Sequence, residues 1–303
     1  MADLHVVTGA FGFTGRYIAE RLLGDGLRVR TLTGHPDRPN PFGERIEVAL
    51  LDFKNHARLV QDLSGARCLY NTYWVRFARG ETTYDGAVEN SRRLFAAAAE
   101  AGVGKLVHIS VTNPSQNSPL PYFRGKAQVE QAVIDSRLPY AIIRPSLVYG
   151  DNDILVNNVA WSLRHSPFFP IPGDGEYRVQ PVFVEDVARL AVDAGQSAES
   201  LAQDAVGPEV FAYRELVERI RLAVRSRSRI VSLPPTLVLL LSSLIGIAIK
   251  DVVLTRGEID GLMASLLVST DPPTASTLFS EWLASRGKHL GVHYASELAR
   301  HFR

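Results

Sequence analysis

Cysteine is nearly absent from this chain of 303 residues, in which Cys68 stands alone. A single cysteine excludes any intramolecular disulfide and argues against a secreted protein framed by disulfides. An excess of charge is also missing, because 33 Lys and Arg face 32 Asp and Glu, for a net charge of +1. Bulk charge therefore does not indicate a nucleic-acid partner, and none is predicted.

Several sequence signals are missing as well. Residues 1–5 lack the basic start and apolar stretch of a signal peptide, so we expect a cytoplasmic protein. There is no G-x-x-x-x-G-K-[ST] loop and no G-x-S-x-G elbow, so kinase and serine-hydrolase functions have no support. His289 and His293 are four residues apart, but no ligand cluster completes the set and no metal site is predicted.

What is present is a chain able to bury a core, with 46% hydrophobic and 21% charged residues. Apolar runs of strand length alternate with helical patterns, which predicts an α/β fold: a doubly wound parallel sheet with helices on both faces. The predicted strands cover residues 4–8, 28–33, 46–51, 67–71, 106–110 and 140–144. The clearest predicted helices cover residues 82–101 and 122–136.

The sequence pattern changes after residue 150, where proline and glycine cluster between residues 167 and 175. Two more strand-and-helix pairs are predicted, one with a strand at 182–184 and a helix at 185–194, the other with a strand at 205–206 and a helix at 213–224. Residues from 236 onward are expected to be helical. We therefore predict a nucleotide-binding core of residues 1–150 with returning elements near 178–206, and a smaller, mostly helical lobe of residues 151–303.

The strongest motif lies where the first predicted strand ends, with Gly9, Gly12 and Gly15 in the spacing G-x-x-G-x-x-G before a helix. Glycines at such a point let the backbone turn tightly and approach a pyrophosphate, whose charge is met by free amides and the positive end of the helix. A strand-to-helix turn without a ligand is the weaker interpretation. The context favours nucleotide binding.

This motif, together with Leu51-Asp52-Phe53, the pair Tyr122 and Lys126, and Ile143-Arg144-Pro145, resembles the short-chain dehydrogenase/reductase superfamily. The likeness is to its extended and atypical branches, the NAD-dependent epimerase/dehydratase-like proteins, including the nucleotide-binding accessory subunits of respiratory complex I. It extends over most of residues 4–190. The resemblance implies a Rossmann-type core and a nicotinamide cofactor. The cofactor contacts that we assign are Gly9, Phe11, Gly12, Phe13, Thr14, Gly15, Arg16, His35, Arg38, Asp52, Phe53, Asn71, Lys126 and Pro145.

The end of the second predicted strand bears on the choice of cofactor, since an acidic residue there would accept the ribose hydroxyls of NAD. None is present, and Arg16, His35 and Arg38 are basic candidates for a 2′-phosphate. We therefore predict NADP in preference to NAD; the alternative is that all three side chains are ordinary solvated surface charges. Asp52 has two interpretations, a contact to the adenine or a cap of the next turn.

A lysine one helical turn after a tyrosine lowers the pKa of the phenol and holds the nicotinamide ribose. Tyr122 and Lys126 have this spacing and are the predicted acid/base and its partner. The hydroxyl that orients the substrate is assigned to Ser110, with Thr112 left open. Aromatic residues such as Trp74 and Tyr149 are candidates for the substrate pocket, although packing in the core is the more common role.

These observations predict an NAD(P)-dependent oxidoreductase or epimerase/dehydratase-like enzyme that transfers a hydride on a small carbonyl, alcohol or sugar-type substrate. The alternative is a scaffold or redox sensor that binds NADP(H) without turnover. A third interpretation is an isomerase that retains its cofactor through each cycle.

One segment fits none of these functions. Residues 214–229 carry six arginines and two glutamates, and Ile230 to Ile249 carry no charge at all. A helix that begins after the two prolines spans about 21 Å, short of the roughly 30 Å hydrocarbon core of a bilayer. We expect a buried helix or a subunit interface, for example of a homodimer, in preference to a membrane contact through residues 230–249.

Overall fold

The computed structural model describes residues 3–301 and divides the chain into two compact units. Unit 1 takes the chain up to Pro145 and then Val184–Ala205, and unit 2 takes Ser146–Phe183 and the chain from Val206 onward. The chain therefore passes from one unit to the other after Pro145, Phe183 and Ala205.

Unit 1 is built on a seven-stranded parallel sheet with the order β11-β6-β5-β4-β1-β2-β3. Its strands are β1 (Leu4–Thr8), β2 (Arg28–Thr33), β3 (Ile46–Leu50), β4 (Ala66–Asn71), β5 (Leu106–Ile109), β6 (Tyr140–Pro145) and β11 (Leu201–Ala205). The six strands predicted in the first half are confirmed to within one residue at each end. A strand order that grows outward from β1 in both directions is that of a doubly wound Rossmann-type fold.

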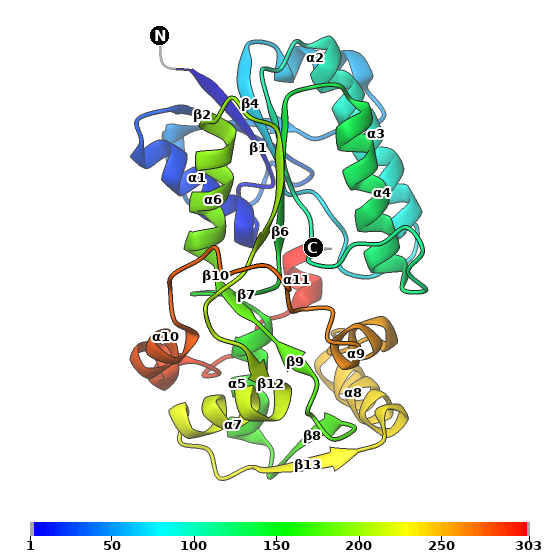
Figure 1. Cartoon of the computed structure of the whole chain (residues 1–303), viewed down its shortest axis with the longest axis vertical. Helices are drawn as coiled ribbons and strands as arrows, with labels where there is room; N and C mark the ends of the chain where they lie inside the picture. Colours follow the sequence, from blue (N-terminus) through cyan, green and yellow to red (C-terminus); the bar gives the residue numbers. More distant parts are fainter. Residues whose placement is uncertain (1–2, 302–303) are drawn as a thin grey trace. The chain divides into compact units, whose positions relative to one another are not determined.

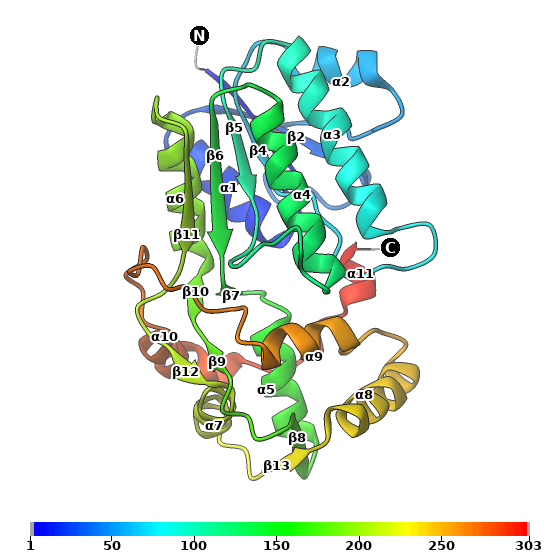
Figure 2. The same ribbon diagram turned by 45° about the vertical axis from the view of Figure 1, so that its right-hand side comes forward.

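Helices cover both faces of this sheet, as predicted (Figure 1, Figure 2). One face carries α1 and α6, which pack together, and the other carries α2, α3 and α4. These helices are α1 (Phe13–Gly24), α2 (His56–Leu63), α3 (Tyr84–Glu100), α4 (Pro121–Asp135) and α6 (Val184–Gln196), with a short 3-10 turn, η1, at Gly43–Arg45. Where the strands reverse their direction of growth, between β1 and β4, the carboxyl ends open a natural place for a ligand.

Local signals explain where two of these helices begin. The Thr83 hydroxyl accepts the Gly86 amide at 3.0 Å and caps α3, and the Asn55 side chain accepts the Arg58 amide at 3.1 Å and caps α2. α4 starts with Pro121, whose ring fits the first helical turn and whose missing N–H is not needed there. These caps fix the frame in which α3 and α4 lie on the sheet.

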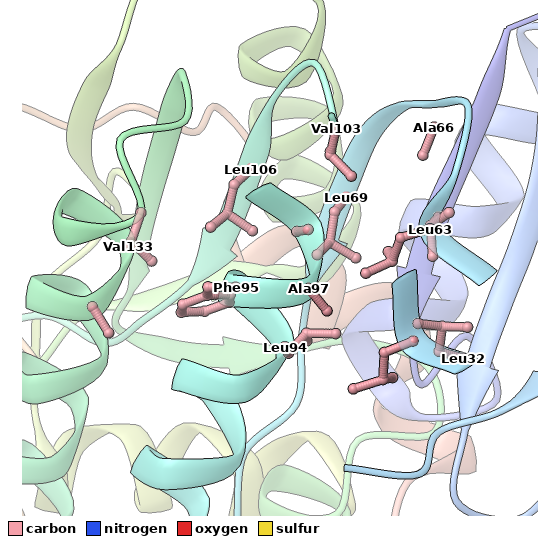
Figure 3. Packing of buried hydrophobic residues seen from close by; sticks show 14 of the residues in the cluster. Leu32, Leu63, Ala66, Leu69, Leu94, Phe95, Ala97, Val103, Leu106 and Val133 are labelled. Atoms are coloured by element: carbon pink, nitrogen blue, oxygen red, sulfur yellow. The ribbon is translucent and has the colours of Figure 1, made fainter. Parts of the chain in front are cut away.

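The core of unit 1 fills the space between the sheet and α2–α4 (Figure 3). Leu32 and Leu69 from the strands meet Leu63 of α2, and Leu94 and Phe95 of α3, and all five side chains are at most 1% exposed. Burial of five such side chains is worth roughly 1.5–3 kcal/mol each, before the loss of chain entropy is subtracted. The core therefore holds the strand ends rigidly beside one another.

Unit 2 combines short strand pairs with helices. Its strands are β7 (Leu147–Tyr149), β8 (Phe168–Pro172), β9 (Arg178–Val179), β10 (Pro181–Phe183), β12 (Phe211–Ala212) and β13 (Arg229–Leu233), paired as β7 with β10, β9 with β12 and β8 with β13. Its helices are α5 (Leu155–His165), α7 (Tyr213–Ala223), α8 (Pro235–Ile249), α9 (Arg256–Met263), α10 (Phe279–Arg286) and α11 (Glu297–His301), with a 3-10 turn, η2, at Gly287–His289.

The bounds predicted for the strand at residues 205–206 were wrong. The strand there, β11, runs over Leu201–Ala205, and a separate short strand, β12, precedes α7. β11 is the edge strand of the sheet and contains Gln203 and Asp204. Its backbone pairs in parallel with β6, so its strand conformation rests on the ladder and not on apolar side chains. A search for apolar runs consequently locates its end and misses its start.

The uncharged segment 230–249 is not buried within the chain, which was one of its two expected roles; the other, a subunit interface, stays a prediction. Its first residues form β13, and α8 then begins at Pro235. Only Val238, Ser242 and Gly246 are buried in α8, and most of its leucines and isoleucines are exposed or half-buried. Among residues 3–301, no helix is both long enough and apolar enough to cross a membrane.

Candidate nucleotide and catalytic site

The glycine motif forms a tight loop between β1 and α1. Gly9 has a φ of +67° and its amide donates to the Leu32 carbonyl at 2.8 Å. A Cβ on Gly15 would lie 2.4 Å from the Gly9 carbonyl oxygen, and one on Gly12 would lie 3.1 Å from the same atom. Since a Cβ contact of 2.4 Å does not occur in proteins, a glycine is required at position 15 for the first turn of α1 to pack against the loop.

The loop leaves the start of α1 open to a ligand. Gly12 is the N-cap and offers no side-chain cap, and the first turn contains no acidic residue. The first amides of an α-helix have no acceptor within the helix, and they carry the positive end of its dipole. Phe13, Thr14 and Gly15 thus begin a helix suited to a phosphate group.

The residues assigned to the adenosine half lie beyond β2 and β3. Gly34, His35 and Asp37 are exposed, and Arg38 is half-buried, so that burial lowers the pKa of its guanidinium from the ordinary value. Arg16 is in an exposed ion pair with Glu20, at 2.8 Å.

After β3, the Asp52 carboxylate accepts the Lys54 amide at 2.9 Å, which is the capping interpretation of this residue, while its role toward adenine stays a prediction. The Phe53 ring lies 4.6 Å from that of Tyr73, between centroids.

A buried polar network links the ends of β1, β4 and β5. The Asn71 amide oxygen accepts the Thr8 hydroxyl at 3.1 Å, and its amide nitrogen lies 3.0 Å from Nδ1 of His108. Asn71 and His108 are both fully buried. Burial lowers the pKa of His108 well below its usual value, and the charge of Lys126 acts in the same direction, so the ring is neutral. This network holds the strand ends in register; sequence reasoning assigned Asn71 and missed His108.

Tyr122 and Lys126 lie on successive turns of α4, as predicted from their spacing. The Lys126 ammonium is buried, with Nζ donating to the Ile109 carbonyl at 2.9 Å and lying 4.9 Å from the centre of the Trp74 ring. Burial lowers the pKa of Lys126 to about 7, against an opposing effect of Glu130. Lys126 thus joins α4 to the carboxyl end of β5.

Aromatic rings surround the Tyr122 side chain. Its ring packs edge-on against Trp74 at 5.9 Å and against Tyr84 at 6.1 Å, and Trp74 and Tyr84 are stacked 6.0 Å apart. A Cβ on Gly125 would lie 2.8 Å from the Trp74 ring, so a glycine at that position lets the indole lie directly on α4. Neither Tyr84 nor Gly125 was singled out from the sequence, because their role depends on where β4 ends in space.

Glu130 continues the same side of α4 one turn beyond Lys126. Its carboxylate binds the Arg144 guanidinium through two hydrogen bonds, of 2.9 and 2.6 Å, which ties the helix to β6. The i, i+4 spacing of Lys126 and Glu130 was the signal available in the sequence for this residue.

Ser110 and Thr112 both follow β5 and both are buried. Within the described residues the Ser110 hydroxyl has no hydrogen-bond partner, and neither has Nε2 of His108 on the same strand end. The Thr112 amide donates to the carbonyl of Pro145, the last residue of β6, at 3.0 Å. A buried hydroxyl without a partner costs free energy unless a ligand supplies one.

The residues present therefore fit a nicotinamide dinucleotide on two counts. The glycine cradle has no room for a side chain at Gly15, and orphaned polar atoms of Ser110 and His108 lie where β5 ends. When bound, such a cofactor supplies a hydride donor or acceptor; the chain supplies the cradle, the hydroxyls and the lysine.

Other aromatic candidates for a substrate pocket pack within unit 2. Tyr149 is wholly buried against Phe279 and Trp282, and Trp161 stacks on His165. The Asn157 side chain holds the Gly291 amide and the His293 carbonyl at 3.0 and 2.9 Å. The burial of Tyr149 agrees with the interpretation of such aromatic residues as core, whereas Trp161 and Asn157 are half-buried.

Comparison with known proteins gives two informative relatives. The chain is 27% identical to "NADH dehydrogenase [ubiquinone] 1 alpha subcomplex subunit 9, mitochondrial" of Arabidopsis thaliana over 239 residues, 75% of this chain and 60% of that protein. It is 31% identical to "(4-alkanoyl-5-oxo-2,5-dihydrofuran-3-yl)methyl phosphate reductase" of Streptomyces griseus over 218 residues, 69% of this chain and 70% of that one. The matched part of the chain thus spans about six-tenths of the plant protein's length.

Among solved structures, the triphenylmethane reductase of Citrobacter sp. has a TM-score of 0.75 at 15% identity, covering 94% of this chain and 99% of its own. At that identity the likeness shows the fold alone. The family model described as "NAD dependent epimerase/dehydratase family" matches residues 5–206, which contain the glycine cradle, Tyr122 and Lys126. The chain therefore belongs to the NAD-dependent epimerase/dehydratase family.

Proposed function

We propose that this protein is an NADP(H)-dependent reductase of a small carbonyl compound. The proposal rests on one observation at the end of β5. There the buried Lys126 ammonium donates to the Ile109 carbonyl, and the hydroxyl of the next residue, Ser110, has no hydrogen-bond partner within the described residues. Tyr122 lies one turn before Lys126 on α4. The relative of 31% identity that is named as a reductase supports the direction of the reaction.

In this mechanism Ser110 donates a hydrogen bond to the substrate oxygen and Tyr122 gives it a proton. Lys126 holds the ribose and lowers the pKa of Tyr122 by its charge when protonated. The pKa of Lys126 is lowered to about 7 in the free protein. The negative charge of a bound dinucleotide would raise this pKa and so favour the ammonium form. The Trp74 and Tyr84 rings keep water from this side of Tyr122.

The proposal prefers NADP because no acidic residue stands directly at the end of β2, where Gly34 and His35 follow Thr33 and the half-buried Arg38 comes soon after. Arg38 is the stronger candidate for the 2′-phosphate, since it lies half-buried in the segment that follows β2, where the adenosine ribose of a dinucleotide would lie. Fluorescence titration with NADPH and NADH tests this choice. We expect Arg38→Ala to weaken NADPH binding at least tenfold and leave NADH binding unchanged, and Arg16→Ala to have the smaller effect.

Substitution of Tyr122 tests catalysis. We expect Tyr122→Phe to lower kcat for NADPH oxidation by at least 100-fold across a panel of aldehydes, ketones and enones, with the Kd for NADPH within twofold of the parent. Tyr84→Phe is the matched control, because its hydroxyl donates to the Arg76 carbonyl at 2.9 Å in the same aromatic cluster. Unchanged turnover in Tyr122→Phe would remove this tyrosine from the mechanism.

A second function, an NADP(H)-binding protein without turnover, is favoured by one observation: the half-buried Tyr122 ring packs edge-on against Trp74 and Tyr84. The plant relative named as a subunit of NADH dehydrogenase is consistent with it. Tight NADPH binding with no oxidation by any substrate would support this function, and nucleotide retained through purification would favour an isomerase. If neither NADPH nor NADH binds at millimolar concentration, all three functions are wrong.

A further inference from the structure

Helix α8 has its apolar side turned outward. The side chains that α8 buries are Val238, Ser242 and Gly246, spaced at i, i+4 and i+8 on one stripe. On the other side, Leu240 and Leu244 are each 55% exposed and Ile247 is 75% exposed. An ordinary surface helix has the reverse arrangement, with large apolar residues inside and small polar ones outside.

The orientation of α8 is fixed by its packing. A Cβ on Gly246 would lie 2.6 Å from the Asp251 carbonyl oxygen, so the buried stripe accepts no larger residue there. The Asp251 carboxylate in turn accepts the Tyr294 hydroxyl at 2.8 Å and the amides of Glu297 and Leu298 at 2.8 and 2.9 Å. We call these three hydrogen bonds to the Asp251 carboxylate the Asp251 clamp. A rotation of α8 that buried its leucines would separate Gly246 from Asp251 and break the clamp.

Positive charge adjoins the apolar helix. Arg225, Arg227 and Arg229 are exposed in the segment that leads into β13, and Lys250 is exposed at the end of α8. None of the four takes part in an ion pair within residues 3–301. From Arg219 to Lys250 the sequence contains no acidic residue. The stretch of chain that contains these arginines and α8 therefore carries charge of one sign.

The basic segment is ordered by the backbone. Arg225 has a φ of +55° at the end of α7, and its amide donates to the Leu222 carbonyl at 3.0 Å. The Ser226 hydroxyl donates to the Leu163 carbonyl, and the Ser228 amide donates to the Ser226 hydroxyl at 3.0 Å. Arg225, Arg227 and Arg229 line a groove of about 630 Å³ together with Phe168, which is 52% exposed and pairs with Arg229 in the β8–β13 ladder.

In both ribbon views the segment 224–229, β13 and α8 follow one another along a single edge of unit 2 (Figure 1, Figure 2). We propose that this edge is a binding surface for an anionic lipid bilayer, with the apolar side of α8 and Phe168 in the interface and Arg225, Arg227, Arg229 and Lys250 on the headgroups. This proposal does not depend on the enzymatic function.

Charge complementarity decides the occupant. A second copy of the chain in a two-fold dimer would bring the same uncharged helix and the same arginines, with no acid to meet them. An anionic bilayer offers apolar depth for Leu240, Leu244 and Ile247 and phosphates for the basic side chains. A helix of 15 residues is about 22 Å long, which suits it to lie along the interface.

Vesicle sedimentation tests the proposal with the full chain. We expect binding to vesicles of 30% phosphatidylglycerol in phosphatidylcholine, and at least tenfold weaker binding to pure phosphatidylcholine. Leu240→Ser combined with Ile247→Ser should weaken binding at least tenfold, and Arg225→Gln combined with Arg227→Gln about 30-fold at low salt. Val48→Ser combined with Ile134→Ser removes two exposed apolar residues of unit 1 and should change nothing.

Thermal melts establish that each variant is folded before its binding is compared. Absence of vesicle binding by the parent protein overturns the proposal, as does binding that is indifferent to the α8 substitutions. Sedimentation velocity covers the rival occupant: a dimer that Leu240→Ser and Ile247→Ser dissociate, in a protein that does not bind vesicles, assigns this surface to a second copy and also overturns the proposal.

Discussion

Different kinds of contact stabilise the interior of each of the two units. Unit 1 is built on a sheet whose central strands are buried, and its site depends on close backbone approaches, such as that of Gly15 to the Gly9 carbonyl. Within the described residues, the sheets of unit 2 have two strands each, and polar side chains such as Asp251, Asn157 and Asn158 hold its C-terminal segment by hydrogen bonds to the backbone. A regular sheet can thus carry a ligand loop with little help from side chains, whereas an irregular lobe needs many specific polar contacts.

The largest effect is expected from the backbone contact in unit 1. Gly15→Val places a branched side chain where even a Cβ would lie 2.4 Å from the Gly9 carbonyl oxygen. We expect the free energy of unfolding to fall by about 4–5 kcal/mol and NADPH binding to be lost. Denaturant unfolding and NADPH titration measure both. Gly24→Ala at the end of the same helix is the control, since nothing lies within 4 Å of its Cβ, and it should not destabilise the protein. A Gly15→Val variant that binds NADPH normally would contradict the cradle.

The next effect concerns Lys126, whose folded pKa of about 7 lies below the ordinary lysine value of 10.5. The unfolded chain holds this proton up to about pH 10, so burial of the charge costs most below pH 7 and the cost declines as the pH rises between these values. Lys126→Met should therefore raise stability by about 3–4 kcal/mol at pH 6 and by little at pH 10.

Denaturant unfolding of Lys126→Met and the parent at pH 6, 8 and 10 measures this difference. The exposed Lys54 gives the control, because Lys54→Met should change stability by less than about 0.5 kcal/mol. A Lys126→Met protein that is less stable than the parent at pH 6 would contradict this prediction. It would show that the contacts of the Lys126 ammonium stabilise unit 1 by more than the burial of its charge costs.

The smallest effect is expected in unit 2. Burial raises the pKa of Asp251, but hydrogen bonds from the Leu298 amide, the Tyr294 hydroxyl and the Val252 and Glu297 amides outweigh it and lower the pKa below its usual value. The clamp is therefore present above about pH 4 and lost as the pH falls through the folded pKa. Asp251→Asn should cost about 2 kcal/mol at pH 7 and less at pH 3.

Hydrogen exchange locates that change. We expect faster exchange at the Glu297 and Leu298 amides in Asp251→Asn, with unchanged protection in β1 and β4. Asp37→Asn, an exposed position of unit 1, is the control. If protection falls equally in both units, the comparison drawn above between two independently fastened regions fails.

Sequence reasoning located the strands of unit 1 because each is an apolar run between turn signals, and Val6, Val7 and Leu69 could hardly lie elsewhere than in a buried sheet. It located Tyr122 and Lys126 because their spacing is a property of one helix. It did not find His108, Glu130 or Tyr84, whose roles depend on neighbours from other strands and helices.

Unit 2 was less accessible for the same reason. Nothing in the local pattern of 230–249 says which side of α8 is buried, because the close contact that buries Gly246 is made with the turn at Asp251, beyond the segment. The expectation that leucine and isoleucine are buried was reasonable and was wrong for Leu240, Leu244 and Ile247. Hydropathy alone does not distinguish a helix that is buried in the core from a helix whose apolar side is exposed in the isolated chain.

The last strand of the large sheet has a consequence for synthesis on the ribosome. β11 pairs with β6, yet about 55 residues separate the two in the chain, first the Ser146–Phe183 part of unit 2 and then α6 of unit 1. Until residues 201–205 emerge, the outer edge of β6 has unpaired backbone groups, and such an edge is a template for pairing with other chains. The nascent protein should therefore be most prone to aggregation between the emergence of β6 and that of β11, and a chaperone that shields this edge would raise its yield most in that interval.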